Sequence, residues 1–234
     1  MGRRVLRWTT GVVVVLALVV AAGWAGYRWV LPHHRPDLAA GERYGIDVSA
    51  HQGDVDWEAV AADGIDAAYL KSSEGATFED PRFAANWAGA REAGLEVGAY
   101  HFFTLCKDGP EQAENLLARL REVGADDTAL PPVLDLELSG NCSARPPRGV
   151  VDQRLTDLVE AVERGTGRRV VLYALDDWTS RYPLPEDLRD RDRWERRLLL
   201  RPSTDGWAWW QVSSRASVAG IDGPVDLDVV APRG

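Results

Sequence analysis

The chain has 234 residues, of which 27 are Lys or Arg, 36 are Asp or Glu, 45% are hydrophobic and two are Cys. This composition excludes a disordered chain, a collagen-like repeat and a small protein built on disulfides. The first 36 residues hold five Arg and no acid, which leaves 22 basic and 36 acidic residues, a net charge of −14, for the other 198. A domain this acidic is poorly suited to binding nucleic acid, and its length is sufficient for one large core.

The N-terminal residues 1–30 have the pattern of a membrane anchor. Three Arg within the first seven residues precede an uncharged run over 8–27, which is long enough to cross a bilayer. The positive-inside bias places the amino terminus in the cytoplasm and the domain outside it, in the periplasm or cell wall. Small residues at 21–23 leave open a cleaved signal peptide and a secreted protein. Residues 31–42, with Pro and His and no periodicity, are expected to link this segment to a domain over 43–234.

From residue 43 on, short apolar runs alternate with amphipathic stretches. Strands are predicted at 44–48, 67–71, 95–103, 132–138 and 169–174, and helices at 56–62, about 80–94, 110–123 and 150–164, the second helix with Asp80 as its N-cap. Later the pattern weakens to strand-like runs at 198–200, 207–211 and 225–229 with little helix between them. Five βα units followed by three strands predict an α/β fold, a closed parallel-type barrel like the TIM barrel. The alternative, an open doubly wound sheet, lacks its usual glycine-rich phosphate motif here.

Acidic residues occur where these strands end. In the run 133–137, side-chain alternation directs Asp135 and Glu137 to one face of the strand and the two Leu to the other. Asp47 lies at the end of the first strand, opposite in phase to Ile46 and Val48, and Asp226 begins the last strand. Because the first and last strands of a closed barrel are neighbours, we expect the four acids to meet at the mouth, where such barrels keep their active sites. A solvated strand end would account for Asp226 alone, but not for a buried acidic pair.

An acidic pair at the mouth of a barrel fits either metal binding or glycoside hydrolysis. Glycoside hydrolysis needs one protonated and one ionised carboxyl, and mutual repulsion raises one of the two pKa values. Aromatic residues favour this reaction, because sugar rings stack on flat faces; the strand-borne candidates are Tyr69, Tyr100, Tyr173 and Trp209. Core packing is the expectation for Trp194 and Trp207. No His or Cys cluster has metal-ligand spacing, so neither a metal nor a cofactor is expected.

The two cysteines, Cys106 and Cys142, follow the third and fourth strands. An oxidising compartment favours their pairing in an exported domain, and closing this loop would stabilise the fold by about 4 kcal/mol. Two free thiols are the alternative. Lys71 and Glu74 are expected to form an ion pair, and His101, which alternates with Tyr100, is expected in the core.

Five motifs in this order resemble glycoside hydrolase family 25. They are YGIDVSAHQGDVDW (44–57), YLKSSEGATFEDPRF (69–83), GLEVGAYHFF (94–103), PPVLDLE (131–137) and WWQVSS with GPVDLD (209–228). The resemblance implies a flattened barrel of five βα units and three further strands. It also implies an N-acetylmuramidase-type lysozyme, which cleaves the β-1,4 bond between N-acetylmuramic acid and N-acetylglucosamine of peptidoglycan. We expect the protein to be a monomer.

The resemblance also implies roles for individual residues. Glu137 matches the general acid, Asp135 its partner carboxylate, and Asp47 and Asp226 the flanking acids, while Tyr100 and Gln211 match pocket positions. The sequence departs from the family pattern where Val212 replaces a Tyr, and where the plain run 198–200 stands in for a Trp-bearing strand. A non-catalytic glycan-binding module on the same fold is the alternative, followed by a metal-dependent hydrolase.

Overall fold

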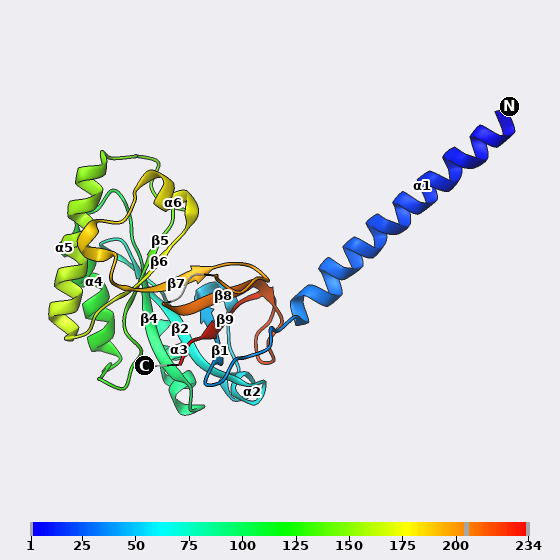
Figure 1. The fold of residues 1–234 in the computed structure, drawn as a ribbon. Helices are drawn as coiled ribbons and strands as arrows, with labels where there is room; N and C mark the ends of the chain where they lie inside the picture. Colours follow the sequence, from blue (N-terminus) through cyan, green and yellow to red (C-terminus); the bar gives the residue numbers. More distant parts are fainter. Residues whose placement is uncertain (1, 204–205, 233–234) are drawn as a thin grey trace.

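In the computed structural model of the protein, which describes residues 2–203 and 206–232, eight strands close into a barrel (Figure 1). Around the ring they are β1 (Arg43–Val48), β2 (Ile65–Glu74), β4 (Glu96–Phe102), β5 (Val133–Leu136), β6 (Val171–Ala174), β7 (Asp192–Arg196), β8 (Trp207–Ala216) and β9 (Val225–Val230). β9 pairs with both β8 and β1, and β1 pairs with β2, which completes the ring. The short β3 (Phe78–Glu79) forms a hairpin with β2.

Helices follow each of the first five parallel strands along the chain. They are α2 (Trp57–Ala62) after β1, α3 (Phe83–Glu92) after the β2–β3 hairpin, α4 (Gly109–Glu122) after β4, α5 (Arg148–Thr166) after β5 and α6 (Asp176–Arg181) after β6. The 3₁₀ turns η3 (Ala50–Gln52) and η4 (Glu186–Leu188) lie in connections. The predicted five βα units followed by three strands are thus confirmed. The barrel is mixed, since β9 runs antiparallel to both of its neighbours.

Alternating side chains divide the core into two layers. Outward-facing residues such as Ile46, Val48 and Leu134 pack beneath the helices in the larger apolar cluster. Inward-facing residues, among them Tyr69 and Val133, fill the barrel with aromatic and branched side chains. This alternation is the reason that acids on the inward face of a strand end up together at the mouth of the barrel.

Two sequence-based expectations are wrong. The run 198–200 is not a strand: the sixth strand of the barrel is β7 (Asp192–Arg196), and the three Leu lie 41%, 44% and 64% exposed in the following loop. Asp80 does not cap α3, which begins at Phe83 without a side-chain cap. The carboxylate of Asp80 instead accepts hydrogen bonds from the backbone N–H groups of Ala50 and Arg82, both at 2.9 Å, and so fixes the loop after β1.

The N-terminal helix α1 (Gly2–Ala25) projects away from the barrel and continues through a π-helical turn, η1 (Gly26–Val30), and the 3₁₀ turn η2 (Leu31–His33) (Figure 1). Within the described residues, the stretch Val13–His33 has a mean hydropathy of 1.8 and is not buried by the protein. Its length and composition suffice to cross a membrane, a test that a signal sequence near the N-terminus also passes.

Candidate active site

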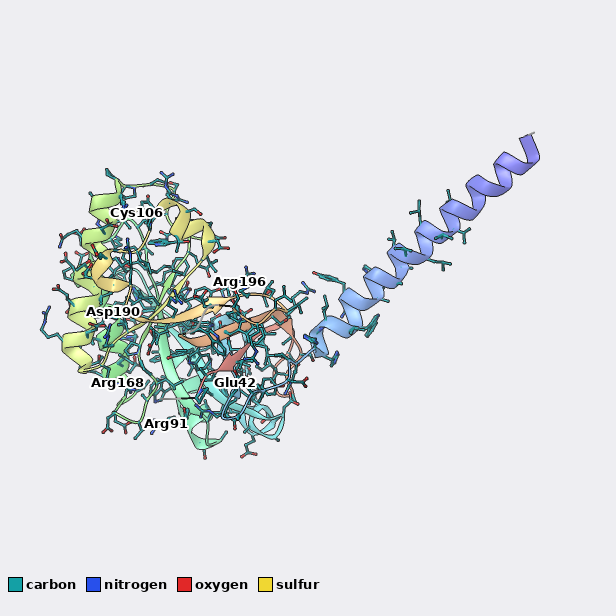
Figure 2. All side chains as sticks on the ribbon, viewed as in Figure 1. Glu42, Arg91, Cys106, Arg168, Asp190 and Arg196 are labelled. Atoms are coloured by element: carbon teal, nitrogen blue, oxygen red, sulfur yellow. A yellow bond between two sulfur atoms is a disulfide. The ribbon has the colours of Figure 1, made fainter. Side chains whose placement is uncertain are left out.

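A cavity of about 130 Å³ opens at the carboxyl ends of the parallel strands. Figure 2 shows Cys106 and Arg196 toward this end of the barrel and Arg91 and Arg168 toward the other. The cavity is lined by the four predicted acids, by three aromatic residues and by two others: Asp47, Asp135, Glu137, Asp226, Tyr100, Tyr173, Trp194, Val133 and Gln211. The structure therefore brings together all four acids, as their positions in the strands predicted.

The strand β5 supplies the central pair. Val133 and Asp135 face the cavity, whereas Leu134 and Leu136 are fully buried on the opposite face. Asp135 lies within the strand, and its Oδ1 atom is buried without a hydrogen-bond partner among the described residues. Glu137 lies one residue beyond the end of the strand and is only partly buried. The deeper carboxyl is thus Asp135, and the one nearer the mouth is Glu137.

The second pair depends on the direction of β9. Because β9 is antiparallel to β1, its first residues lie at the carboxyl end of β1, and Asp226 stands opposite Asp47 in the register. Asp228, two residues further along the same face of β9, is completely buried. Its Oδ1 accepts a hydrogen bond of 2.8 Å from Trp194 Nε1, while Oδ2 has no partner among the described residues.

Burial and like charges shift the ionisation of these acids in one direction. Burial raises the pKa of Asp135 well above its ordinary value, and the neighbouring Glu137 raises it further. Burial also raises the pKa of Glu137. The Asp135–Glu137 pair therefore retains a proton at a higher pH than two isolated carboxyl groups would.

The same causes act on the other acids of the site. Burial raises the pKa of Asp226 to about 6, although the Gln211 side chain and Arg196 both oppose this shift. Burial, followed by the charge of Asp226, raises the pKa of Asp47 and that of Asp228 well above their usual range. The cavity therefore holds fewer negative charges near neutral pH than its carboxyl groups could carry.

Two basic residues favour the ionised forms of the central pair. Lys71 lowers the pKa of Asp135, and Arg196 lowers that of Glu137. Lys71 is itself held by Glu74, with Nζ 2.8 Å from Oε2, which confirms the expected ion pair. Its ammonium lies 5.2 Å from the centre of the Phe102 ring. The proton content of the pair is thus set by burial on one side and by these two cations on the other.

Aromatic side chains form part of the cavity wall. Tyr100, Tyr173 and Trp194 line it, and Tyr173 Oη donates a 2.7 Å hydrogen bond to Gln211 Oε1. Tyr69 and Trp209, expected to bind substrate, lie elsewhere: they are 0% and 3% exposed inside the barrel, below the cavity. Tyr69 Oη donates to the Pro131 carbonyl, and the Tyr69 ring packs at 4.5 Å on Trp209. Neither residue presents a ring face to the cavity.

Sequence reasoning missed the Trp194–Asp228 pair. Trp194 is packed in the core as expected, 5.2 Å from Tyr69, but it also lines the cavity. Its strand, β7, is the Trp-bearing strand that the sequence appeared to lack. The available signal was the spacing in VDLD at 225–228, because two acids two residues apart in a strand face the same way.

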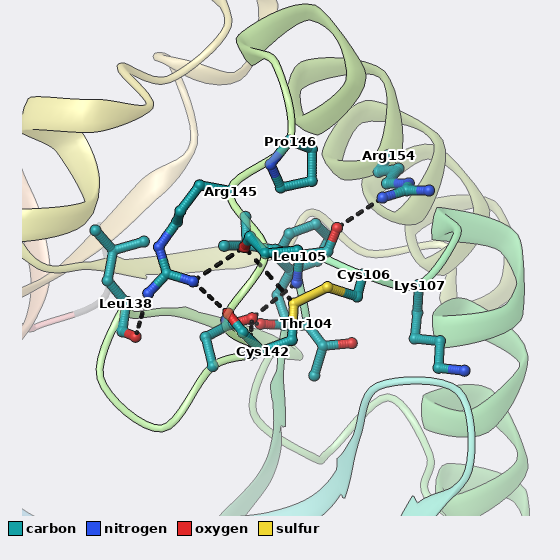
Figure 3. The surroundings of a disulfide bond; sticks show 12 residues. Thr104, Leu105, Cys106, Lys107, Leu138, Cys142, Arg145, Pro146 and Arg154 are labelled. Carbon is teal, nitrogen blue, oxygen red and sulfur yellow. Dashed lines mark hydrogen bonds between the residues drawn. A yellow bond between two sulfur atoms is a disulfide. The ribbon is translucent and has the colours of Figure 1, made fainter.

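The loops after β4 and β5 are joined by a disulfide bond (Figure 3). Cys106 and Cys142 form the expected disulfide. Arg145 donates hydrogen bonds to the carbonyl groups of Cys142 and Leu138, and Arg154 donates one of 2.7 Å to the Leu105 carbonyl. These contacts hold the loop that follows the catalytic candidate Glu137 against the end of the neighbouring strand.

Asn141 completes this junction. Its amide oxygen accepts from the N–H groups of Leu105 and Cys142, at 2.9 and 3.0 Å. Its amide nitrogen donates to the carbonyl groups of Phe103, at 2.7 Å, and of Glu137, at 3.0 Å. All four hydrogen-bonding positions of the side chain are therefore used, and one of them fixes the backbone of Glu137.

The remaining polar candidates have structural partners. His101 is fully buried, as expected, with Nδ1 2.8 Å from Ser73 Oγ, and burial lowers its pKa to about 4. Over residues 2–203 and 206–232 no group of three His, Cys, Asp or Glu side chains is arranged to hold a metal ion.

A closed α/β barrel with a carboxyl pair of raised pKa between aromatic walls has the form of a glycoside hydrolase. Residues 46–221 match the sequence profile of glycosyl hydrolases family 25. The uncharacterized protein YegX of Escherichia coli (strain K12) is 35% identical over 204 residues, 80% of this chain and 68% of that protein. Lysozyme M1 of Streptomyces globisporus is 30% identical over 192 residues, 78% of this chain and 65% of that protein.

A solved structure agrees with these sequence matches. The family 25 glycosyl hydrolase from Bacillus anthracis superposes with a TM-score of 0.74 at 32% identity, over 86% of this chain and 94% of that chain. The chain therefore belongs to glycosyl hydrolases family 25 and is a glycoside hydrolase. The resemblance carried by the five motifs is confirmed.

Proposed function

We propose that the protein is a peptidoglycan hydrolase of the N-acetylmuramidase type, which cleaves the β-1,4 bond between N-acetylmuramic acid and N-acetylglucosamine. The observation that carries the proposal is the Asp135–Glu137 pair, whose pKa values are raised at the mouth of the barrel. Relatives named as lysozymes and as N,O-diacetylmuramidases support the choice of substrate.

The positions of the two carboxyl groups assign their roles in this proposal. Glu137 lies nearer the mouth and donates the proton to the glycosidic oxygen as the bond breaks. Asp135 lies deeper and, as a carboxylate, stabilises the positive charge that develops at the anomeric carbon, directly or through the 2-acetamido group of the substrate. Loss of the proton from Glu137 leaves two neighbouring carboxylates, and their repulsion favours return of a proton to Glu137 when water attacks in the second half of the reaction.

The other cavity residues serve binding and water activation. Asp47 and Asp226 face the same cavity and orient the attacking water or the substrate hydroxyl groups. Tyr100 and Tyr173 supply flat faces for sugar rings, and Gln211, held by Tyr173, supplies an amide for hydrogen bonding. Tyr69 and Trp209 support this wall from beneath. No cofactor takes part in these steps.

We further propose that residues 1–30 are an uncleaved membrane anchor. Residues 31–42 then join it to a monomeric catalytic domain, residues 43–234, outside the cytoplasm. The uncharged helix and its flanking Arg and Trp residues support this topology. A cleaved signal peptide would place the same domain outside the cell without the anchor.

The test is incubation of the full chain with purified peptidoglycan. Soluble sugar–peptide fragments should appear, and they should appear equally in EDTA, because the carboxyl pair needs no metal. Binding of the protein without release of fragments would support a glycan-binding module instead. Loss of release in EDTA would support a metal-dependent hydrolase.

A further inference from the structure

The N-terminal helix joins the barrel at its catalytic end. β8 runs parallel to β7, so the carboxyl end of β8 lies at the same end of the barrel as Glu137. At that end the guanidinium of Arg215 lies 4.6 Å from the centre of the Tyr27 ring. Two residues further, the N–H of Ser217 donates a 2.7 Å hydrogen bond to the carbonyl of Pro32. We refer to residues 213–217 as the catalytic rim.

The connecting segment, residues 31–42, is fixed to the barrel over its length. Arg35 binds Asp63, with Nη1 2.7 Å from the backbone carbonyl. Tyr44 Oη donates 2.7 Å to the carbonyl of Pro36. Arg201 pairs with Glu42, with Nη2 2.9 Å from Oε2. Although its sequence has the composition of a linker, this segment does not leave the domain free to move away from the helix.

The aromatic residues of the anchor set the depth of the rim. Trp24, Tyr27 and Trp29 are exposed and follow the apolar run, the position at which Trp and Tyr occupy the membrane interface. Because Arg215 packs on Tyr27, it lies at the same depth, where its guanidinium can bind lipid phosphate. The six residues from Tyr27 to Pro32 are helical, and the rise from the first to the last is about 8 Å, so the rim cannot lie far above the head groups.

We propose that the catalytic rim rests against phospholipid head groups at the outer face of the membrane, so that the cleft takes glycan strands lying at the membrane surface. The inference depends on the proposed function for the identity of the glycan and on the uncleaved anchor. Beyond the proposed function, it specifies where the substrate lies, at the outer surface of the membrane. Without the fixed segment, the −14 charge of the remaining chain would hold the domain away from an anionic surface.

Fluorescence energy transfer in vesicles tests whether the catalytic rim lies close to the lipid head groups. The full chain is reconstituted with phosphatidylcholine, phosphatidylglycerol and a head-group-labelled acceptor lipid. A membrane-impermeant donor is attached from outside to Ser214→Cys at the rim or to Glu92→Cys at the end of α3. Both positions are exposed, and because Cys106 and Cys142 are bonded to each other, the introduced thiol is the reactive one. We expect clearly stronger transfer from position 214 than from position 92.

The matched variant carries 30 Gly/Ser residues between Val30 and Leu31. This insertion keeps the contacts of the connecting segment but adds a tether with a reach of roughly 30 Å. We expect it to abolish the difference in transfer between the two positions. Equal transfer from both positions without the insertion, or an unchanged difference with it, would overturn the proposal.

Rates on two substrates separate this inference from the proposed function. On lipid-linked glycan in the same vesicles the insertion should lower the rate several-fold, because it lowers the effective concentration of the active-site cleft at the membrane surface, where this substrate lies. On soluble glycan strands the rates of the two proteins should agree. If neither protein cleaves soluble strands, the proposed function fails; if both cleave lipid-linked and soluble glycan equally well, the location of the substrate is wrong.

Discussion

Glu137 is the residue whose chemistry can be removed with the least change in shape. In Glu137→Gln the side chain keeps its size and an oxygen acceptor, but it cannot give up a proton to the leaving group. We expect kcat on soluble glycan to fall by on the order of 10² to 10⁴, with the melting temperature retained or raised. Turnover near that of the wild type would remove Glu137 from the role of acid.

Asp226 makes a prediction about stability. Its pKa is raised by burial to about 6, above the ordinary value of 3.8, so the folded state binds more protons than the unfolded state between about pH 4 and pH 6. The wild type therefore loses stability as the pH rises through that window. Asp226→Asn carries no charge and should be more stable than the wild type at pH 7 by about 1 to 3 kcal/mol, with no gain at pH 4.

Urea unfolding of both proteins at pH 4 and pH 7 measures this difference. Asp222→Asn, an exposed acid in the connection before β9, is the matched control and should give no pH-dependent gain. A gain for Asp226→Asn of equal size at both pH values would contradict the assigned shift.

Residue positions could be predicted from the sequence wherever a short periodicity determined them. Alternation in 133–137 placed Asp135 and Glu137 in the cavity. It could not place Tyr69 and Trp209, because alternation gives the face of a strand but not the height along the barrel. Inward residues near the amino ends of strands are buried under their neighbours, and those near the carboxyl ends line the site.

At the scale of elements, the junction between the carboxyl ends of β4 and β5 predicts that Asn141 positions Glu137. Asn141→Asp keeps the shape of the side chain but loses the two donors that hold the carbonyl groups of Phe103 and Glu137. We expect kcat to fall by on the order of 10², because Glu137 moves relative to the bound sugar, while KM changes little.

The matched control is Asn115→Asp on α4. The amide of Asn115 also donates to two backbone carbonyls, those of Gly75 and Phe78, both at 3.0 Å, but it does not contact Glu137. Thermal unfolding should register a loss for each variant, whereas kcat should fall for Asn141→Asp alone. Equal losses of kcat would mean that Asn141 contributes only to stability.

The strand β7 shows why one element escaped the sequence reading. Its residues DRWER carry a single apolar side chain, that of Trp194. The outward-facing Arg193 and Glu195 pair with each other at 3.1 Å and do not pack in the core beneath a helix, so the sequence shows no apolar alternation here. The Leu run at 198–200 has a stronger β signal but remains exposed in a loop. The antiparallel direction of β9 could not be predicted from the sequence either, because strand direction follows from closure of the whole sheet and not from a local pattern.

At the scale of the whole molecule, charge predicts the effect of salt. The −14 charge of residues 37–234 repels the carboxylates of peptidoglycan at long range, whereas stacking and hydrogen bonds act within the cleft. For the full chain in a non-ionic detergent, initial rates on soluble glycan should rise from about 10 mM to 200 mM salt, as the screening length shortens. A steep fall over this range would indicate binding through a basic surface.

The reducing end of the product tests the central claim most directly. Fragments released from purified peptidoglycan by the full chain are reduced with borohydride and identified by mass spectrometry. A muramidase leaves N-acetylmuramic acid at every new reducing end, and this end should be absent after treatment with the Glu137→Gln variant. New reducing ends of N-acetylglucosamine, or fragments cut only in the peptide, would contradict the account.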